Sequence, residues 1–141
     1  MYPPHLVAPM KKDLTEVGFQ SLETAADVDG FMADPKGISM VVVNSVCGCA
    51  AGAARPGIKA ALAFSDLKPD NLVTVFAGAD NEATAKMREY LLPYPPSSPC
   101  IAMFKDNELI HFIERHHIEG RNAQMIAEHL VGAFEEFCEN A

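Results

Sequence analysis

The chain has 141 residues, of which 49% are hydrophobic and 21% are charged, a balance typical of a single globular domain. Its formal net charge of −8 argues against a surface that binds nucleic acid or an anionic membrane. The longest apolar runs, such as Met40–Val43, are far shorter than the ~20 residues that a membrane-spanning helix needs. We therefore expect one domain over residues 1–141 that contacts neither nucleic acid nor membrane.

Hydrophobic spacing and helix-breaking residues predict an alternation of helices and strands. Apolar residues at helical spacing before Gly18 predict a first helix, within an N-terminal helical extension over residues 1–18. Thr24 and Asn81 are each expected to cap a helix, and Pro56 is expected to kink one. The expected helices cover residues 7–17, 24–33, 49–63, 82–92 and 122–138, and the expected strands cover residues 19–22, 38–44, 72–77, 100–105 and 108–114.

The order of these elements predicts the α/β class. The run Ile38–Asn44 is rich in β-branched residues, which is typical of a central strand covered on both faces. Strands that alternate with helices early in the chain are expected to pair in parallel, and the last two strands are expected to form an antiparallel hairpin. We therefore expect a thioredoxin-like fold, with a central mixed sheet flanked by helices and an extra N-terminal helix.

Two closely spaced cysteines, Cys47 and Cys49, lie between the most apolar strand and a helix. A thiol at a helix N-terminus faces unpaired backbone N–H groups and the positive end of the helix dipole, which both favour the thiolate. The thiolate is the nucleophile in thiol–disulfide exchange. We expect Cys47 to be the exposed, attacking cysteine and Cys49 to be the less exposed, resolving cysteine.

A single residue, Gly48, separates the two thiols. A disulfide closed across one residue forms a small ring whose dihedral angles are expected to be strained. Strained disulfides have higher reduction potentials than relaxed ones. We therefore expect a Cys47–Cys49 disulfide to be reduced easily, or Cys47 to act through mixed disulfides.

A second feature is Ser98-Pro99-Cys100 at the start of a strand. In a thioredoxin-like sheet a cis-proline at this point faces the reactive cysteines, so we expect the Ser98–Pro99 bond to be cis and both residues to contact the substrate.

The strand that precedes Cys47 carries no carboxylate, which leaves proton handling to water, the helix terminus or Asn44. We place Asn44 with Ser98 and Pro99 among the expected substrate-binding residues.

The Asn-Ser-Val-Cys-Gly-Cys block over residues 44–49 resembles the bacilliredoxin family of thioredoxin-like proteins. The resemblance extends from Leu6 to Cys138. Membership would imply a thiol–disulfide oxidoreductase that removes the low-molecular-weight thiol bacillithiol from protein mixed disulfides, with Cys47 attacking and Cys49 resolving. The lack of a membrane span and of a secretory signal in the sequence separately leads us to expect a cytoplasmic location. We expect no cofactor and no bound metal. Further matching blocks cover residues 74–78, 82–90, 96–99 and 111–120.

Other interpretations stay open at this point. One is a general protein disulfide isomerase or oxidase with the same cysteines, and another is a metal or iron–sulfur module held by Cys47, Cys49 and Cys100. We expect Cys100 to be a packed core thiol and Cys138 to be a surface or half-buried one. The sequence leaves open the client proteins, the reductant and the oligomeric state, with a homodimer among the states it allows.

Two adjacent histidines, His116 and His117, also suggest a metal ligand pair, but we expect them to be solvated side chains in a loop. Arg55 lies in the helix that follows the cysteines. It is expected either to lend positive charge near the thiols or to be exposed to solvent.

Overall fold

A computed structural model describes residues 2–138 of the chain. Five strands form one mixed sheet in the order β1-β3-β2-β4-β5. β1, β3 and β2 are parallel neighbours, whereas β4 is antiparallel to both β2 and β5. The thioredoxin-like fold predicted from the element order is confirmed. The strands are β1 (Gln20–Ser21), β2 (Ile38–Asn44), β3 (Asn71–Phe76), β4 (Cys100–Lys105) and β5 (Glu108–Ile113).

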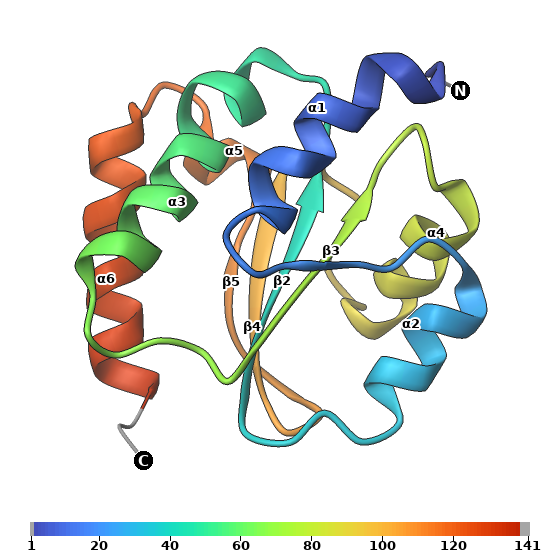
Figure 1. Cartoon of the computed structure of the whole chain (residues 1–141). Coiled ribbons are helices and arrows are strands. Elements are labelled where there is room, and N and C mark those ends of the chain that lie inside the picture. The colour runs from blue at the N-terminus through green and yellow to red at the C-terminus, as the bar shows by residue number, and fades with distance from the viewer. Residues whose placement is uncertain (1, 139–141) are drawn as a thin grey trace.

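Helices cover both faces of this sheet, so the molecule has three layers (Figure 1). The central strand β2 is buried along its whole length, which explains why it is the most apolar run in the sequence. One face packs against α1, α3 and α6, and the other packs against α2 and α4. The helices are α1 (Pro4–Thr15), α2 (Ala25–Met32), α3 (Arg55–Phe64), α4 (Asn81–Tyr90), α5 (Arg115–Ile118) and α6 (Ala123–Phe137).

The helical segment that follows β2 begins at Gly48 and contains a π-helical turn, η1 (Ala50–Ala54), before it continues as α3. Pro56 lies just after this turn and supplies no N–H for an i→i−4 bond. In the wider turn the N–H of Arg55 donates to the carbonyl of Ala50. The disturbance expected from Pro56 is therefore seen as a π turn, a form often found near functional sites.

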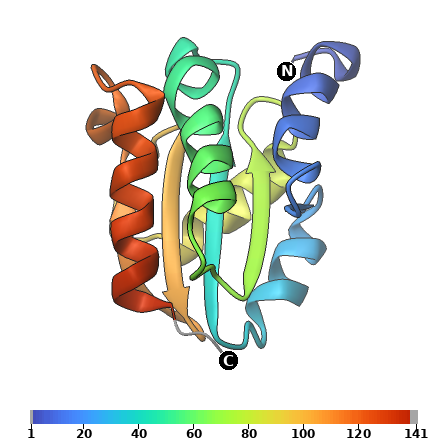
Figure 2. The same ribbon diagram turned by 60° about the vertical axis from the view of Figure 1, so that its left-hand side comes forward.

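α3 and α6 run side by side in the same direction on one face of the sheet (Figure 2). Gly57 permits their close approach, because a Cβ at this position would lie 2.7 Å from the Cβ of Ile126. The two helices start at the same end of the molecule, where β2 also ends. This packing fixes the helix that carries the cysteine pair against the rest of the core.

Several boundaries differ from the expectation, each for a local reason. The first helix begins at Pro4 rather than residue 7, and Pro9 lies inside it. The cap of α4 is Asp80 instead of Asn81, and its side chain makes no capping bond, since its carboxylate lies 2.6 Å from the Lys11 amine. The helix α5 was expected to be a loop, because a four-residue helix is too short to show periodicity in the sequence.

In the part of the chain that the structure describes, no helix has the length and apolar character needed to cross a membrane.

Candidate functional site

Cys47 lies in the N-cap position of the helical segment that begins at Gly48. Its carbonyl accepts hydrogen bonds from the N–H groups of Ala50 and Ala51, at 3.0 and 3.1 Å. Its Sγ accepts a hydrogen bond from the backbone N–H of Cys49 at 3.4 Å. The sulfur thus occupies the place that the oxygen of a Ser or Asn cap usually takes, directly at the positive end of the helix.

This position changes the acidity of both thiols. The backbone N–H of Cys49 contributes most to holding the pKa of Cys47 below its ordinary value, and the charge of Arg115 adds to the effect. The pKa of Cys49 is raised, first because its thiol donates a hydrogen bond to Cys47 and then by burial. The pair therefore consists of one sulfur prepared to ionise and one that holds its proton, which is the asymmetry expected of an attacking and a resolving thiol.

A buried arginine supports the turn that carries Cys47. Only 4% of Arg55 is exposed, and its guanidinium donates to the Oδ1 of Asn44 at 2.9 Å and to the carbonyl of Ser45 at 2.7 Å. The same guanidinium meets the carboxylate of Asp13 on α1 at 3.3 Å. Of the two roles expected for Arg55, solvent exposure is wrong; the side chain instead joins β2, the cysteine turn and α1 from within.

Asn44 is part of this internal network. Its amide nitrogen donates to the carbonyl of Met10 at 3.2 Å, and its oxygen also accepts from the N–H of Ser45 at 2.9 Å. The hydroxyl of Ser45 in turn accepts from the N–H of Cys47 at 3.2 Å. The contacts of Asn44 are thus directed into the protein, toward the turn that holds the sulfur.

Cys47 opens onto a hollow of about 510 Å³, a volume within the range of small-molecule sites. Its two charged lining residues are both arginines, Arg88 from α4 and Arg115 from α5. Ser98 lines it as well, and its carbonyl accepts a hydrogen bond from Nη1 of Arg115 at 3.3 Å. The remaining lining residues are Tyr2, Ser45, Val46, Ala77 and Gly78.

Of the segment Ser98-Pro99-Cys100, Ser98 lines this hollow. The Ser98–Pro99 peptide bond is cis, which confirms that prediction, and Pro99 itself is buried. Ser98 and Cys47 both line this hollow, although they are far apart in the sequence. Tyr2, which also lines the hollow, lies against Gly78, where a Cβ would be only 2.6 Å from the tyrosine ring and where the backbone has a positive φ of 85°.

The other two cysteines have different surroundings. Cys100 is buried at the start of β4, as expected, and burial raises the pKa of its thiol to about 12. Cys138 is also buried, so the expectation of a surface or half-buried thiol is wrong. It follows the last turn of α6 and packs into the core on that face of the sheet, and burial raises its pKa to about 11.

Among residues 2–138, the structure brings together no metal-ligand cluster made of Cys47, Cys49 and Cys100. Over residues 2–138, the single group of three His, Cys, Asp or Glu residues with ligand atoms all within 4.8 Å of one another is Glu114, His116 and His117. The two histidines are exposed as expected, but they lie on α5 rather than in a loop. The Nδ1 of His117 accepts a hydrogen bond from the N–H of Glu114 at 3.0 Å, so this ring caps the helix.

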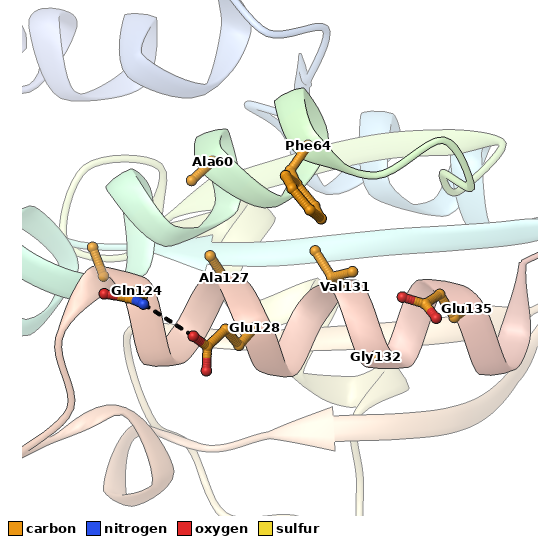
Figure 3. Close-up of a pocket in the computed structure, with 9 residues that line it drawn as sticks. Ala60, Phe64, Gln124, Ala127, Glu128, Val131, Gly132 and Glu135 are labelled. Atoms are coloured by element: carbon orange, nitrogen blue, oxygen red, sulfur yellow. Dashed lines mark hydrogen bonds between the residues drawn. The ribbon is translucent and has the colours of Figure 1, made fainter.

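A larger hollow, of about 650 Å³, lies between α3 and α6 (Figure 3). Its floor is formed by small or apolar residues such as Ala60, Ala127 and Val131, and Phe64 stands at its edge with 79% of its surface exposed. Glu128 and Glu135 are its charged lining residues. None of the residues that line this groove is a cysteine.

Three residues of the smaller hollow were missed by sequence reasoning. Tyr2, Arg88 and Arg115 come from three distant segments, and none of them belongs to a recognisable motif. The only signal in the sequence was that residues 82–90 and 111–120 belong to the blocks that resemble the bacilliredoxin family.

Comparison with known proteins agrees with this geometry. The chain matches the model of a family described as disulphide isomerase over residues 2–138. It is 61% identical to a protein of Cytophaga hutchinsonii named bacilliredoxin, over 96% of this chain and 99% of that protein. It is also 53% identical to a bacilliredoxin of Halalkalibacterium halodurans, over 98% of this chain and 95% of the relative. A bacilliredoxin of Salinibacter ruber is 50% identical over 97% of this chain and 81% of its own length.

Proposed function

Since this chain belongs to the bacilliredoxin family, we propose that it removes a low-molecular-weight thiol, bacillithiol, from mixed disulfides on protein cysteines. Family membership supports thiol–disulfide oxidoreductase activity in general. The observation that carries the specific proposal is the position of Cys47. Its sulfur accepts a backbone N–H at a helix N-terminus and borders a hollow large enough for a small thiol.

In the proposed reaction the thiolate of Cys47 attacks the bacillithiol sulfur of the mixed disulfide. A new disulfide forms between Cys47 and the small thiol, and the sulfur of the client protein leaves as a thiolate that takes up a proton. The pKa shifts support this order, because Cys47 ionises more readily than Cys49. Ser98 and the buried Pro99 are proposed to contact the substrate beside Cys47.

Two routes can then free Cys47. The thiol of Cys49 can lose its proton and attack the sulfur of Cys47, which releases the small thiol and leaves a Cys47–Cys49 disulfide for an external dithiol to reduce. Alternatively, a second small thiol can attack the adduct and leave as a small-molecule disulfide. The proximity of the two residues supports the first route, because the backbone N–H of Cys49 donates to the Sγ of Cys47 at 3.4 Å.

The experiment uses a client protein with one cysteine that carries either bacillithiol or glutathione. We expect the full chain to release bacillithiol faster than glutathione, and Cys47→Ser to release neither. Cys49→Ala should still carry out the first attack and keep the adduct on Cys47. Equal release of both small thiols would contradict the bacillithiol assignment, and release by Cys47→Ser would contradict the attacking role of Cys47.

A general protein disulfide isomerase is the second candidate, which the description of the matching family favours. The same two cysteines would then attack disulfides between protein cysteines. Refolding of a small protein with scrambled disulfides separates the two functions, because an isomerase accelerates it at catalytic concentration, whereas an enzyme restricted to small-thiol adducts leaves its rate unchanged.

A further inference from the structure

We propose that Arg88 and Arg115 form a subsite beside Cys47 that binds a carboxylate of the small-thiol half of the disulfide. The inference rests on the proposed function and extends it from the reacting sulfur to the recognition of its substrate. It assigns a chemical class, a thiol that carries a carboxylate, to the hollow of about 510 Å³.

The charge of this hollow is opposite to that of the chain. The formal net charge is −8, yet the two charged residues that line the hollow are both arginines. The larger groove between α3 and α6, which is lined by Glu128 and Glu135, follows the charge of the chain instead (Figure 3). A concentration of positive charge in one concave site of an acidic protein attracts anions to that site.

Arg88 makes no ion pair with any residue of the described part of the chain, although it lies on a helix where such pairs form. Two residues earlier, Lys86 lies 3.6 Å from the carboxylate of Asp29 and 3.5 Å from that of Glu89. The Nε of Arg88, in contrast, is shielded from solvent and has no hydrogen-bond partner within residues 2–138. A buried N–H donor without an acceptor is costly, so an anion that accepts a hydrogen bond from the guanidinium of Arg88 would be stabilised there.

Arg115 also lines the hollow, and its guanidinium is held by two neighbouring residues. Its Nη1 donates to the carbonyl of Ser98 at 3.3 Å, and its Nε pairs with the carboxylate of Glu119 at 2.5 Å. This pairing neutralises part of the charge of Arg115, which leaves Arg88 as the main unpaired cation of the hollow. A planar guanidinium suits bidentate binding of a carboxylate.

The subsite would decide which sulfur of a mixed disulfide Cys47 attacks. A carboxylate bound by Arg88 places the small-thiol half in the hollow, with its sulfur toward Cys47, and leaves the client protein outside. The attack then produces the adduct of Cys47 with the small thiol and releases the client thiolate. No electrons are needed beyond those of the exchange itself, since one disulfide forms as the other breaks.

Alkylation of Cys47 by a charged and a neutral reagent of similar size tests the subsite directly. For the full chain we expect the ratio of the iodoacetate rate to the iodoacetamide rate to fall about fivefold in Arg88→Met, as the loss of one charge-assisted contact implies. Arg88→Lys should retain part of the ratio. The matched control is Lys86→Met, which removes one positive charge from the same helix outside the hollow and should keep the ratio within about twofold.

An unchanged ratio in Arg88→Met, or an equal fall in Lys86→Met, would overturn the subsite, because general electrostatics would then explain the selectivity. Arg115 is less suited to this test, since its charge also lowers the pKa of Cys47. Alkylation requires no exchange activity, so this result stands whether or not the proposed function is correct.

A second measurement uses disulfides and separates the two proposals. In the Cys49→Ala background, 3,3′-dithiodipropionate carries carboxylates and 2-hydroxyethyl disulfide carries none. We expect the adduct on Cys47 to form faster with the carboxylate reagent, and Arg88→Met to remove that preference. Equal rates would overturn the subsite alone, whereas no adduct with either reagent would overturn the proposed exchange reaction.

Discussion

Two helices that lie side by side on the same face of the sheet begin in different ways. At α6, the Oδ1 of Asn122 accepts a hydrogen bond from the N–H of Met125 at 2.9 Å, an arrangement that stabilises a helix. At the segment that leads into α3, the Sγ of Cys47 accepts from the N–H of Cys49 at 3.4 Å. Sulfur is a weak acceptor when it is protonated, so this second terminus gains less stability and instead favours the thiolate.

Both helices begin with a side chain that accepts a backbone N–H. At α6 this cap, Asn122, stabilises the helix, whereas at the segment leading into α3 the cap, Cys47, is the reactive thiol. Changes at Cys47 are then expected to affect exchange and spare the fold, whereas changes at Asn122 should affect the fold and spare exchange. Four substitutions can break or sharpen this comparison.

The largest effect is expected from Cys47→Ser. A hydroxyl at this position can still accept the N–H of Cys49 and cap the helix, but it supplies no thiolate. We expect exchange with a small-molecule disulfide to fall at least ~100-fold, while the free energy of unfolding changes by less than about 0.5 kcal/mol. Stopped-flow exchange and urea unfolding measure the two quantities, and a large loss of stability would show that the thiol itself holds this terminus together.

Arg55→Met tests the support beneath the cysteine turn. The substitution leaves Asn44 Oδ1 and the carbonyl of Ser45 without the buried donor that they share, so we expect a loss of about 2–4 kcal/mol of stability. Urea unfolding provides the measurement. The control is Arg121→Met, an exposed arginine whose loss should cost less than about 0.5 kcal/mol. Similar values for both variants would mean that the buried network contributes little.

Cys49→Ala removes the resolving thiol but keeps Cys47 at the helix start. We expect this variant to accumulate a mixed disulfide on Cys47 after addition of a small-molecule disulfide, whereas the unmodified chain should release the small thiol again. Intact-mass spectrometry detects the adduct. Rapid loss of the adduct from the variant would show that an external thiol, rather than Cys49, frees Cys47.

The smallest effect is expected from Asn122→Ala. Loss of an asparagine cap costs about 1 kcal/mol, and the rate of exchange should stay the same because Asn122 is not among the residues that line the hollow of Cys47. Urea unfolding and the exchange assay are compared on one preparation. A fall in exchange at unchanged stability would contradict the division of roles between the two termini.

The sequence predicted most of the sheet because burial limits what a central strand can contain. β2 and β4 were placed with their observed bounds, Ile38–Asn44 and Cys100–Lys105, since both are buried along almost their whole length and most of their residues are apolar. The position of Cys47 followed from the strand that precedes it and the helix that follows. Helix ends were less accurate, as at Pro4, because propensity alone does not determine where the first turn begins.

The surroundings of the thiol could not be predicted in the same way. Arg88 and Arg115 reach the hollow from separate elements, α4 and α5, so no spacing in the sequence connects them with Cys47. The burial of Arg55 depends on acceptors from Asn44, Ser45 and Asp13 that come together only in the folded chain.

Alkylation of each cysteine as a function of pH tests the central claim, that the helix start makes Cys47 the reactive thiol. We expect iodoacetamide, with each site followed by mass spectrometry, to modify Cys47 first, with a rate that rises through a pKa below the ordinary cysteine value and then levels off, because only the thiolate reacts. Cys49 should react at higher pH, and Cys100 and Cys138, with pKa values of about 12 and 11, only after unfolding. Faster modification of Cys49 than of Cys47, or equal rates at all four sites, would contradict the account.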